Sequence, residues 1–152
     1  MIQSYINGPV ELTSNTSAVA FTTDCIKSRG ATCAGWLQHM EGSPIYKILE
    51  GGLYEVTFNA NVTSATAGPV ALSLLMDGLP VPGATVIETV VTPGDYSNVA
   101  FTKKIKVCCR GDASLSIASI PSVLTGVPVP GTATDTVAPI LQNANITITR
   151  KA

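Results

Sequence analysis

The sequence predicts one all-β domain, an antiparallel sandwich or barrel, on three observations. Short runs of Val, Ile, Thr, Leu and Tyr are separated by Gly, Pro, Asn and Asp, a pattern typical of such folds. Apolar and polar residues alternate with a period of two, and helical patterning is nearly absent. A chain of 152 residues has the length of a single domain and can bury a core without disulfides.

The clearest strand is expected at residues 53–62, directly after Glu50-Gly51-Gly52. Its apolar residues share one face: Tyr54, Val56, Phe58, Ala60 and Val62. Its polar residues share the other: Glu55, Thr57, Asn59 and Asn61. Because side chains of a strand point alternately to its two sides, the first set predicts a face turned toward the core.

A hairpin is predicted next, where a strand at 70–76 meets Asp77-Gly78. Both turn residues tolerate a positive φ, which tight hairpin turns require. The segment 79–83 contains Pro80 and Pro82, and proline cannot donate a backbone hydrogen bond. This segment is therefore expected at a sheet edge or in a loop.

The remaining segments follow from the same patterns. Strands are expected at 17–23, 85–91, 98–108, 113–120 and 145–150. The pair 98–108 and 113–120 is expected to form a long hairpin that turns at Arg110-Gly111-Asp112. One or two helical turns are assigned to 31–40, and 121–139 is expected to be the longest irregular loop. Residues 1–16 are assigned as an N-terminal attachment arm that contributes little to the core, because Met1–Leu12 shows little alternation.

The composition predicts association between copies of the chain. Charged residues make up 12% of the sequence, roughly half the typical share. A surface poor in Lys and Glu is poorly protected against association, so part of it is expected to be hidden in an oligomer. The alternative is a monomer with a Thr- and Ser-rich face.

Charge and hydropathy exclude two classes of partner. The net charge is −1, and the basic cluster Lys103, Lys104 and Lys106 is split over two faces of its strand, so no nucleic-acid interface is expected. Met1–Ile6 lacks the features of a signal peptide, and no apolar run reaches the roughly 18 residues of a membrane span. The protein is expected to be made in the cytoplasm and to bind no membrane.

No residue is assigned to catalysis, to a cofactor or to a metal. His39 is the only histidine and lies among Trp36, Leu37 and Met40, which favours a packed or surface side chain over an acid–base role. The cysteines Cys25, Cys33, Cys108 and Cys109 contain no Cys-x-x-Cys pair. A zinc site stays an alternative, but buried reduced thiols are the leading interpretation.

Three motifs together resemble a known family of jelly rolls. They are Gly52-Leu53-Tyr54-Glu55-Val56-Thr57-Phe58, then Ala71-Leu72-Ser73-Leu74-Leu75-Met76-Asp77-Gly78 followed by Val81-Pro82-Gly83, and finally Ala144-Asn145-Ile146-Thr147-Ile148-Thr149. These motifs are similar to the tumour-necrosis-factor-like and complement-head-like domains, and most of all to their bacterial and phage branch. The resemblance covers about residues 50–150. It implies an antiparallel jelly-roll sandwich of ten strands, a homotrimer, a last strand at the centre of the inner sheet, and no catalytic residues.

The resemblance also leads to a functional hypothesis. The chain is similar to small structural proteins of phages and prophages, so the leading expectation is a virion protein, a trimeric capsid-decoration or head-fibre protein, assembled in the bacterial cytoplasm. Its partners are then itself and the major capsid or another virion protein. The alternative is a receptor- or carbohydrate-binding head that presents Trp36, Tyr46 or Tyr96 to a host surface glycan.

Overall fold

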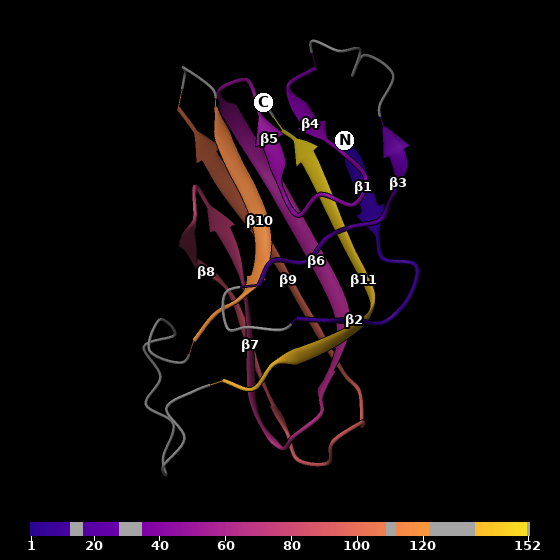
Figure 1. The fold of residues 1–152 in the computed structure, drawn as a ribbon. Coiled ribbons are helices and arrows are strands. Elements are labelled where there is room, and N and C mark those ends of the chain that lie inside the picture. Colours follow the sequence, from indigo (N-terminus) through magenta and orange to yellow (C-terminus); the bar gives the residue numbers. More distant parts are fainter. Residues whose placement is uncertain (13–16, 28–34, 109–111, 122–135, 152) are drawn as a thin grey trace.

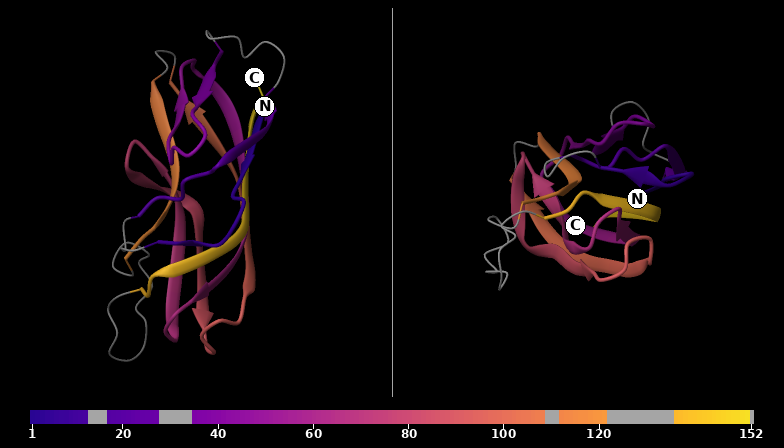
Figure 2. Two further views of the ribbon diagram at one scale, coloured as in Figure 1. Left: turned by 45° about the vertical axis from the view of Figure 1, so that its right-hand side comes forward. Right: turned by 60° about the horizontal axis from the view of Figure 1, so that its bottom comes forward.

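The computed structural model describes residues 1–12, 17–27, 35–108, 112–121 and 136–151, and of residues 26 and 27 only the backbone. These residues form eleven strands in two antiparallel sheets that face each other (Figures 1 and 2). The strands are β1 (Ile2–Tyr5), β2 (Val10–Glu11), β3 (Thr23–Lys27), β4 (Leu37–His39), β5 (Tyr46–Ile48), β6 (Gly52–Ser64), β7 (Gly68–Met76), β8 (Leu79–Val90), β9 (Ser97–Val107), β10 (Ala113–Ser119) and β11 (Pro139–Arg150). No helix within the described residues is long and apolar enough to cross a membrane.

One sheet, called sheet A, has the strand order β3-β1-β11-β6-β9, with β2 paired to the start of β11. The other, sheet B, has the order β4-β5-β10-β7-β8. Both chain termini lie at the same end of the sandwich, beside each other in the left view of Figure 2. Because consecutive strands cross between the sheets, most contacts join segments far apart in the sequence.

The last strand, β11, is central, as the resemblance implied. It pairs with β1 through Ile2↔Ile148 and with β6 through Ile148↔Val56. A bulge interrupts the β6 pairing between Gln142 and Asn145, where Asn143 has a φ of 54°. Asn tolerates this left-handed conformation better than most residues, and the bulge keeps apolar side chains on the core side both before and after it.

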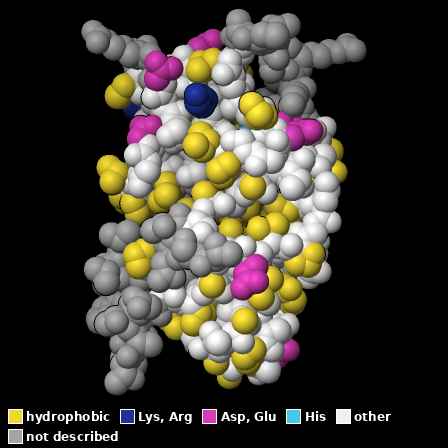
Figure 3. Space-filling view, in the orientation of Figure 1, with side chains coloured by type: hydrophobic (Ala, Val, Ile, Leu, Met, Phe, Trp, Pro, Cys, Tyr) yellow, Lys and Arg dark blue, Asp and Glu magenta, His cyan; other side chains and the backbone are white. Residues whose placement is uncertain are grey.

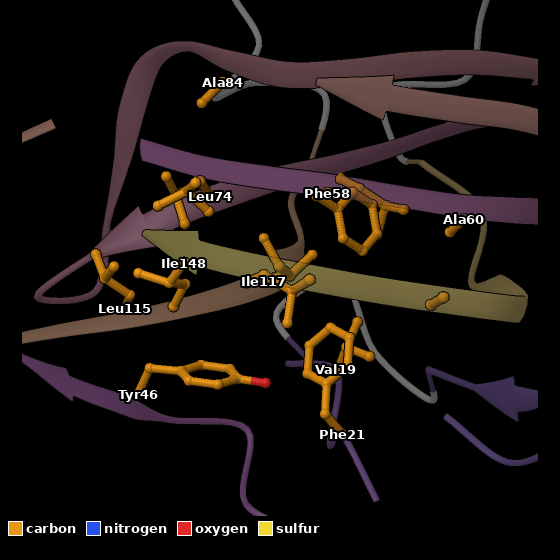
Figure 4. Close-up of a cluster of buried hydrophobic side chains, with 14 of the residues drawn as sticks. Val19, Phe21, Tyr46, Phe58, Ala60, Leu74, Ala84, Leu115, Ile117 and Ile148 are labelled. Atoms are coloured by element: carbon orange, nitrogen blue, oxygen red, sulfur yellow. The ribbon is translucent and has the colours of Figure 1, made fainter. Parts of the chain in front are cut away.

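The core lies between the sheets, and the predicted alternation of β6 is confirmed. Tyr54, Val56, Phe58 and Ala60 are fully buried, whereas the residues between them stay partly exposed. Figure 4 shows side chains of both sheets pointing toward one another in this space. The labelled residues are Val19, Phe21, Tyr46, Phe58, Ala60, Leu74, Ala84, Leu115, Ile117 and Ile148.

The sheet edges carry features that hinder further strand pairing. Strand β8 is an edge of sheet B and contains Pro80 and Pro82, so the prediction for segment 79–83 is confirmed. The Asp77-Gly78 turn before it has φ values of 52° and 80°, as predicted for a tight hairpin. Strand β9 is an edge of sheet A and carries three lysines.

The N-terminal segment is the main correction to the sequence analysis. The expectation that Met1–Leu12 contributes little to the core is wrong, because β1 lies inside sheet A between β11 and β3. Ile2, Ile6 and Leu12 are all buried in the hydrophobic core. In β1 only Ile2 and Ser4 face the core, and Gln3 and Tyr5 face outward. This alternation is too short to be recognised in the sequence.

Three further elements differ from expectation. Strands β9 and β10 form no hairpin, because β9 pairs with β6 in sheet A and β10 pairs with β5 and β7 in sheet B. A turn signal does not distinguish a hairpin from a crossing between sheets. The segment 17–23 makes one isolated bridge, Ala18↔Ala118, before β3 begins. Residues 37–39 form a strand instead of helix, and residues 31–34, 122–135, Arg110 and Gly111 lie outside the described residues.

The placement of β1 gives a direct test of the corrected core. Replacing Ile2 with Ala should lower the free energy of unfolding by about 2–5 kcal/mol, because it removes a buried side chain that packs between the sheets. The matched control is Gln3→Ala, one residue along β1 on the opposite face, which should change it by less than about 0.5 kcal/mol. Denaturant unfolding of both variants measures the difference, and equal stabilities would contradict the corrected core.

Candidate functional site

A buried polar cluster joins the two sheets at their β3 and β4 edges. The Ser4 hydroxyl of β1 donates a hydrogen bond to Asp24 Oδ1 of β3 over 2.6 Å. His39 Nδ1 of β4 lies 2.7 Å from the same carboxylate oxygen. The side chains of His39 and Asp24 have no exposed surface. Sheet A contributes the hydroxyl and the carboxylate, and sheet B contributes the imidazole.

The His39 ring is held from three directions. Its Nε2 lies 3.0 Å from the carbonyl oxygen of Ser43, and its face stacks on Tyr46 with the ring centroids 3.9 Å apart. Both ring nitrogens therefore face oxygen acceptors, so both can donate only when the ring is an imidazolium. Burial raises the pKa of the Tyr46 phenol far above its usual range, and the nearby Asp24 charge adds to this, although Ser4 acts in the opposite direction. Tyr46 therefore stays neutral beside Asp24.

The cluster contains the residue types of a Ser-His-Asp hydrolase in an arrangement that cannot perform that chemistry. In a triad the histidine contacts the serine that it deprotonates. Here Ser4 donates to Asp24, and the second nitrogen of His39 points at a backbone carbonyl. A buried hydroxyl whose proton is directed at a carboxylate meets no substrate. The cluster instead links β1 and β3 of sheet A to β4 and β5 of sheet B, and we call it the clasp.

A second candidate is the outward side of sheet A. The pairing registers place polar, uncharged side chains in adjacent rows across four strands, β1, β11, β6 and β9. This polar face consists of one apolar residue, Ala100, and ten polar, uncharged ones: Gln3, Tyr5, Thr57, Asn59, Asn61, Asn98, Thr102, Gln142, Asn145 and Thr147. It contains no Lys, Arg, Asp or Glu, although it lies at the surface of the single chain.

Side-chain hydrogen bonds order this polar face. The hydroxyls of Thr57 and Thr102 lie 3.1 Å apart. The side-chain amide nitrogen of Asn98 donates hydrogen bonds to Asn61 Oδ1 over 3.0 Å and to Asn59 Oδ1 over 3.4 Å. Groups fixed in this way lose little further conformational entropy when a partner covers them.

Toward the chain termini, charges begin where the polar face ends. Lys151 forms a 2.8 Å ion pair with Glu55, and Arg150 contacts Glu50. The hydrogen bond from Lys151 holds the pKa of the Glu55 carboxyl below its usual value, and Lys104 contributes to the same direction. Lys104 and Lys106 point outward on β9, whereas Lys103 pairs with Val56 on the core side, as predicted.

The cysteines and aromatic residues singled out in the sequence form no site in the part of the chain that the structure describes. Cys25 and Cys108 are free and exposed, so the expectation of buried thiols is wrong for these two, and Cys33 and Cys109 lie outside the described residues. No group of three or more His, Cys, Asp and Glu side chains within those residues is placed to hold a metal ion.

The aromatic residues proposed for a glycan site are separated by burial. Tyr46 is fully buried beneath His39, and Trp36 packs against Tyr54 with the ring centroids 5.3 Å apart. Tyr96 is 44% exposed on the loop between β8 and β9. A fully buried Tyr46 offers no face to a sugar.

Comparison with solved structures confirms the fold class. The globular domain of the zebrafish complement 1qA protein is similar over 99% of this chain and 96% of that chain, with a TM-score of 0.57 and 8% sequence identity. A crystal structure of pika GITRL is similar over 95% of this chain and 99% of that chain, with a TM-score of 0.40 and 11% identity. No protein-family model and no curated protein matches the sequence. At this identity the first similarity shows a jelly-roll fold alone, and the phage assignment stays a prediction.

The clasp should matter for stability. Replacing His39 with Ala should lower the free energy of unfolding by about 1–3 kcal/mol, because it removes the imidazole that lies 2.7 Å from the buried Asp24 carboxylate. Gln38→Ala, at the exposed neighbouring position of β4, should change stability by less than about 0.5 kcal/mol. Thermal and denaturant unfolding measure both variants. Equal stability of the two variants would show that the cluster does not stabilise the packing of the two sheets.

Proposed function

We propose that the protein is a non-enzymatic structural module that assembles as a homotrimer through its polar face. The observation that carries the proposal is the absence of charge from eleven outward residues on four neighbouring strands. Lys and Glu ordinarily occupy such positions on exposed sheets, because they keep a surface solvated. Their absence favours a face that is covered by another copy.

The chemistry of the polar face suits burial in an interface. Interface cores are depleted in charged residues, because an ion removed from water needs a well-placed partner. Amides and hydroxyls can instead exchange hydrogen bonds with water for hydrogen bonds with a neighbouring copy. Asn59, Asn98 and Thr102 offer both donors and acceptors, so the polar face can pair with polar groups of a neighbouring copy.

A trimer is the assembly that the sequence resemblance favours. Tumour-necrosis-factor-like and complement-head-like jelly rolls are similar to this chain in motifs and in fold, and trimers are typical of these folds. Three copies related by rotation form a closed ring, which covers the face of every copy equally.

The finer proposal is a bacteriophage virion protein that decorates or stabilises the capsid or forms a head fibre. Its support is the sequence resemblance to small structural proteins of phages and prophages, together with the charge-poor composition. In this role the partner of the trimer is the major capsid protein or another virion protein. The protein is then assembled in the bacterial cytoplasm and located on the virion.

A charge placed on the polar face should prevent assembly without unfolding the chain. Thr102→Lys puts an ammonium group at an exposed position of the polar face, and Thr89→Lys puts one at an exposed position on the outward side of sheet B. In about 1 M salt, light scattering coupled to size exclusion should give three times 15.7 kDa for the wild type and for Thr89→Lys, and 15.7 kDa for Thr102→Lys. A monomeric wild type, or a trimeric Thr102→Lys variant, would contradict the proposed interface.

The virion assignment has a separate test. Heads purified on a density gradient from the phage or prophage that encodes this sequence should contain the 15.7 kDa chain after the tails are removed. Heads produced with Thr102→Lys in place of the wild type should lack the chain, whereas heads produced with Thr89→Lys should retain it. Recovery of the wild-type chain only from the soluble fraction would overturn the virion role and leave the trimer intact.

A further inference from the structure

The charges of this protein are segregated along the length of the sandwich. In sheet A the pairing registers order the residues from one end to the other, and Lys103 pairs with Val56, Lys104 with Glu55, and Arg150 with Tyr54. All Lys and Arg side chains described in sheet A lie between this level and the end that carries both termini. In sheet B the described lysine, Lys47, pairs with Ser114 at the same end.

This end, called the basic end, has an excess of positive charge in the part of the chain that the structure describes. Its cations are Lys47, Lys103, Lys104, Lys106, Arg150 and Lys151. Its carboxylates are Glu50, Glu55, Asp77 and Asp112. Leu53 of β6, which pairs with Lys106 of β9, is 37% exposed. On the face that Figure 3 shows, dark blue Lys and Arg atoms are visible only in the upper part, where magenta Asp and Glu side chains are also present.

The opposite end carries only acidic charges among the described residues. Residues 57–64 of β6 and their partners in sheet A include no Lys or Arg. Glu11 lies beside Ile140 at the start of β11, and Glu88 pairs with Val70 near the start of β7. Asp95 lies on the loop after β8, which a hydrogen bond from Gly94 N to Thr63 Oγ1 fixes at this end.

Exposed apolar side chains accompany these carboxylates. Val91 is 80% exposed and Tyr96 is 44% exposed, both on the loop that holds Asp95. Together with Glu11 and Glu88 they make up a surface that we call the cation-free end. Tyr is enriched in protein interfaces and Lys is depleted from them, which favours a docking role for this surface.

We propose that the basic end of one copy docks on the cation-free end of another, so that assemblies of this chain stack end to end. The partner is a second copy because one chain presents both halves of the complementary pair, lysines at one end and unpaired acidic character at the other. Leu53 and Tyr96 supply apolar contact to the two sides. Lys104 lies one row beyond Thr102 on the same outward side of sheet A, so the contact adjoins the polar face but uses none of its residues.

The geometry of such a contact has a direct consequence for assembly. Joining unlike surfaces is a heterologous contact, and when it follows the long axis of the molecule it leaves one surface of each kind free at the two ends. Stacks of trimers can therefore grow into fibres. If the protein has the proposed virion role, stacking would make it a fibre protein, but the stacking itself is inferred only from the charge distribution of the single chain.

Salt dependence and charge reversal test the proposal. At about 10 mM salt, where charges interact over about 30 Å, the wild type should form particles of two or more base units, and in about 1 M salt it should return to the base unit. The variants Glu88→Lys/Asp95→Lys and Lys104→Glu/Lys106→Glu should each remain at the base unit in low salt. The control Ile45→Lys, an exposed position between the two ends, should stack like the wild type.

Mixing the two reversal variants gives the sharpest outcome. Each retains one intact end, and the two reversed ends carry opposite charges, so an equimolar mixture in low salt should again form particles of two or more base units. Light scattering measures the masses. A wild-type mass that is the same in low and high salt, stacking by either variant alone, or a mixture that stays at the base unit would overturn the proposal. Capture of poly-lysine by the cation-free end without self-association would overturn it as well. The high-salt mass tests the trimer separately, because stacking is measured against whichever base unit is found there.

Discussion

The structure depends on the burial of alternate side chains of β11 between the sheets. Ile146 and Ile148 point into the core, where neither has exposed surface. Since a strand directs successive side chains to opposite sides, their burial forces Asn145 and Thr147 outward. The same strand joins the first strand of the chain to β6, so the rows of the polar face are set by the packing of the core. The surface proposed for assembly is therefore a consequence of how the sandwich is filled.

Much of this fold could be predicted from the sequence because the long strands carry their own pattern. The alternation in 53–62 and the Asp77-Gly78 turn are local signals, and both appear in the structure as expected. The role of β1 could not be read in this way, because four residues give too few alternations. The crossing from β9 to β10 was missed for a different reason, since local sequence does not say which sheet the next strand joins.

The two candidate sites also differ in how far the sequence could predict them. Asp24 and His39 are fifteen residues apart on the edge strands of two different sheets, so no spacing rule connects them. Only the tertiary structure brings these two side chains together. The single histidine of the chain contributes to the packing between the sheets. The outward residues of β6 were visible in the sequence as a polar set. Only the registers with β11 and β9 show that the set continues across four strands without a charge.

Photo-crosslinking tests most directly whether the polar face is covered by other copies of the chain. Tyr5 lies on that face and is 36% exposed, so the larger side chain of p-benzoylphenylalanine at this position can extend outward from the sheet. Tyr96, 44% exposed at the cation-free end, is the matched control. In about 1 M salt, which screens contacts between exposed charges, position 5 should give bands at two and three times 15.7 kDa, and position 96 a band at 15.7 kDa. A band at 15.7 kDa alone from position 5 would contradict the account.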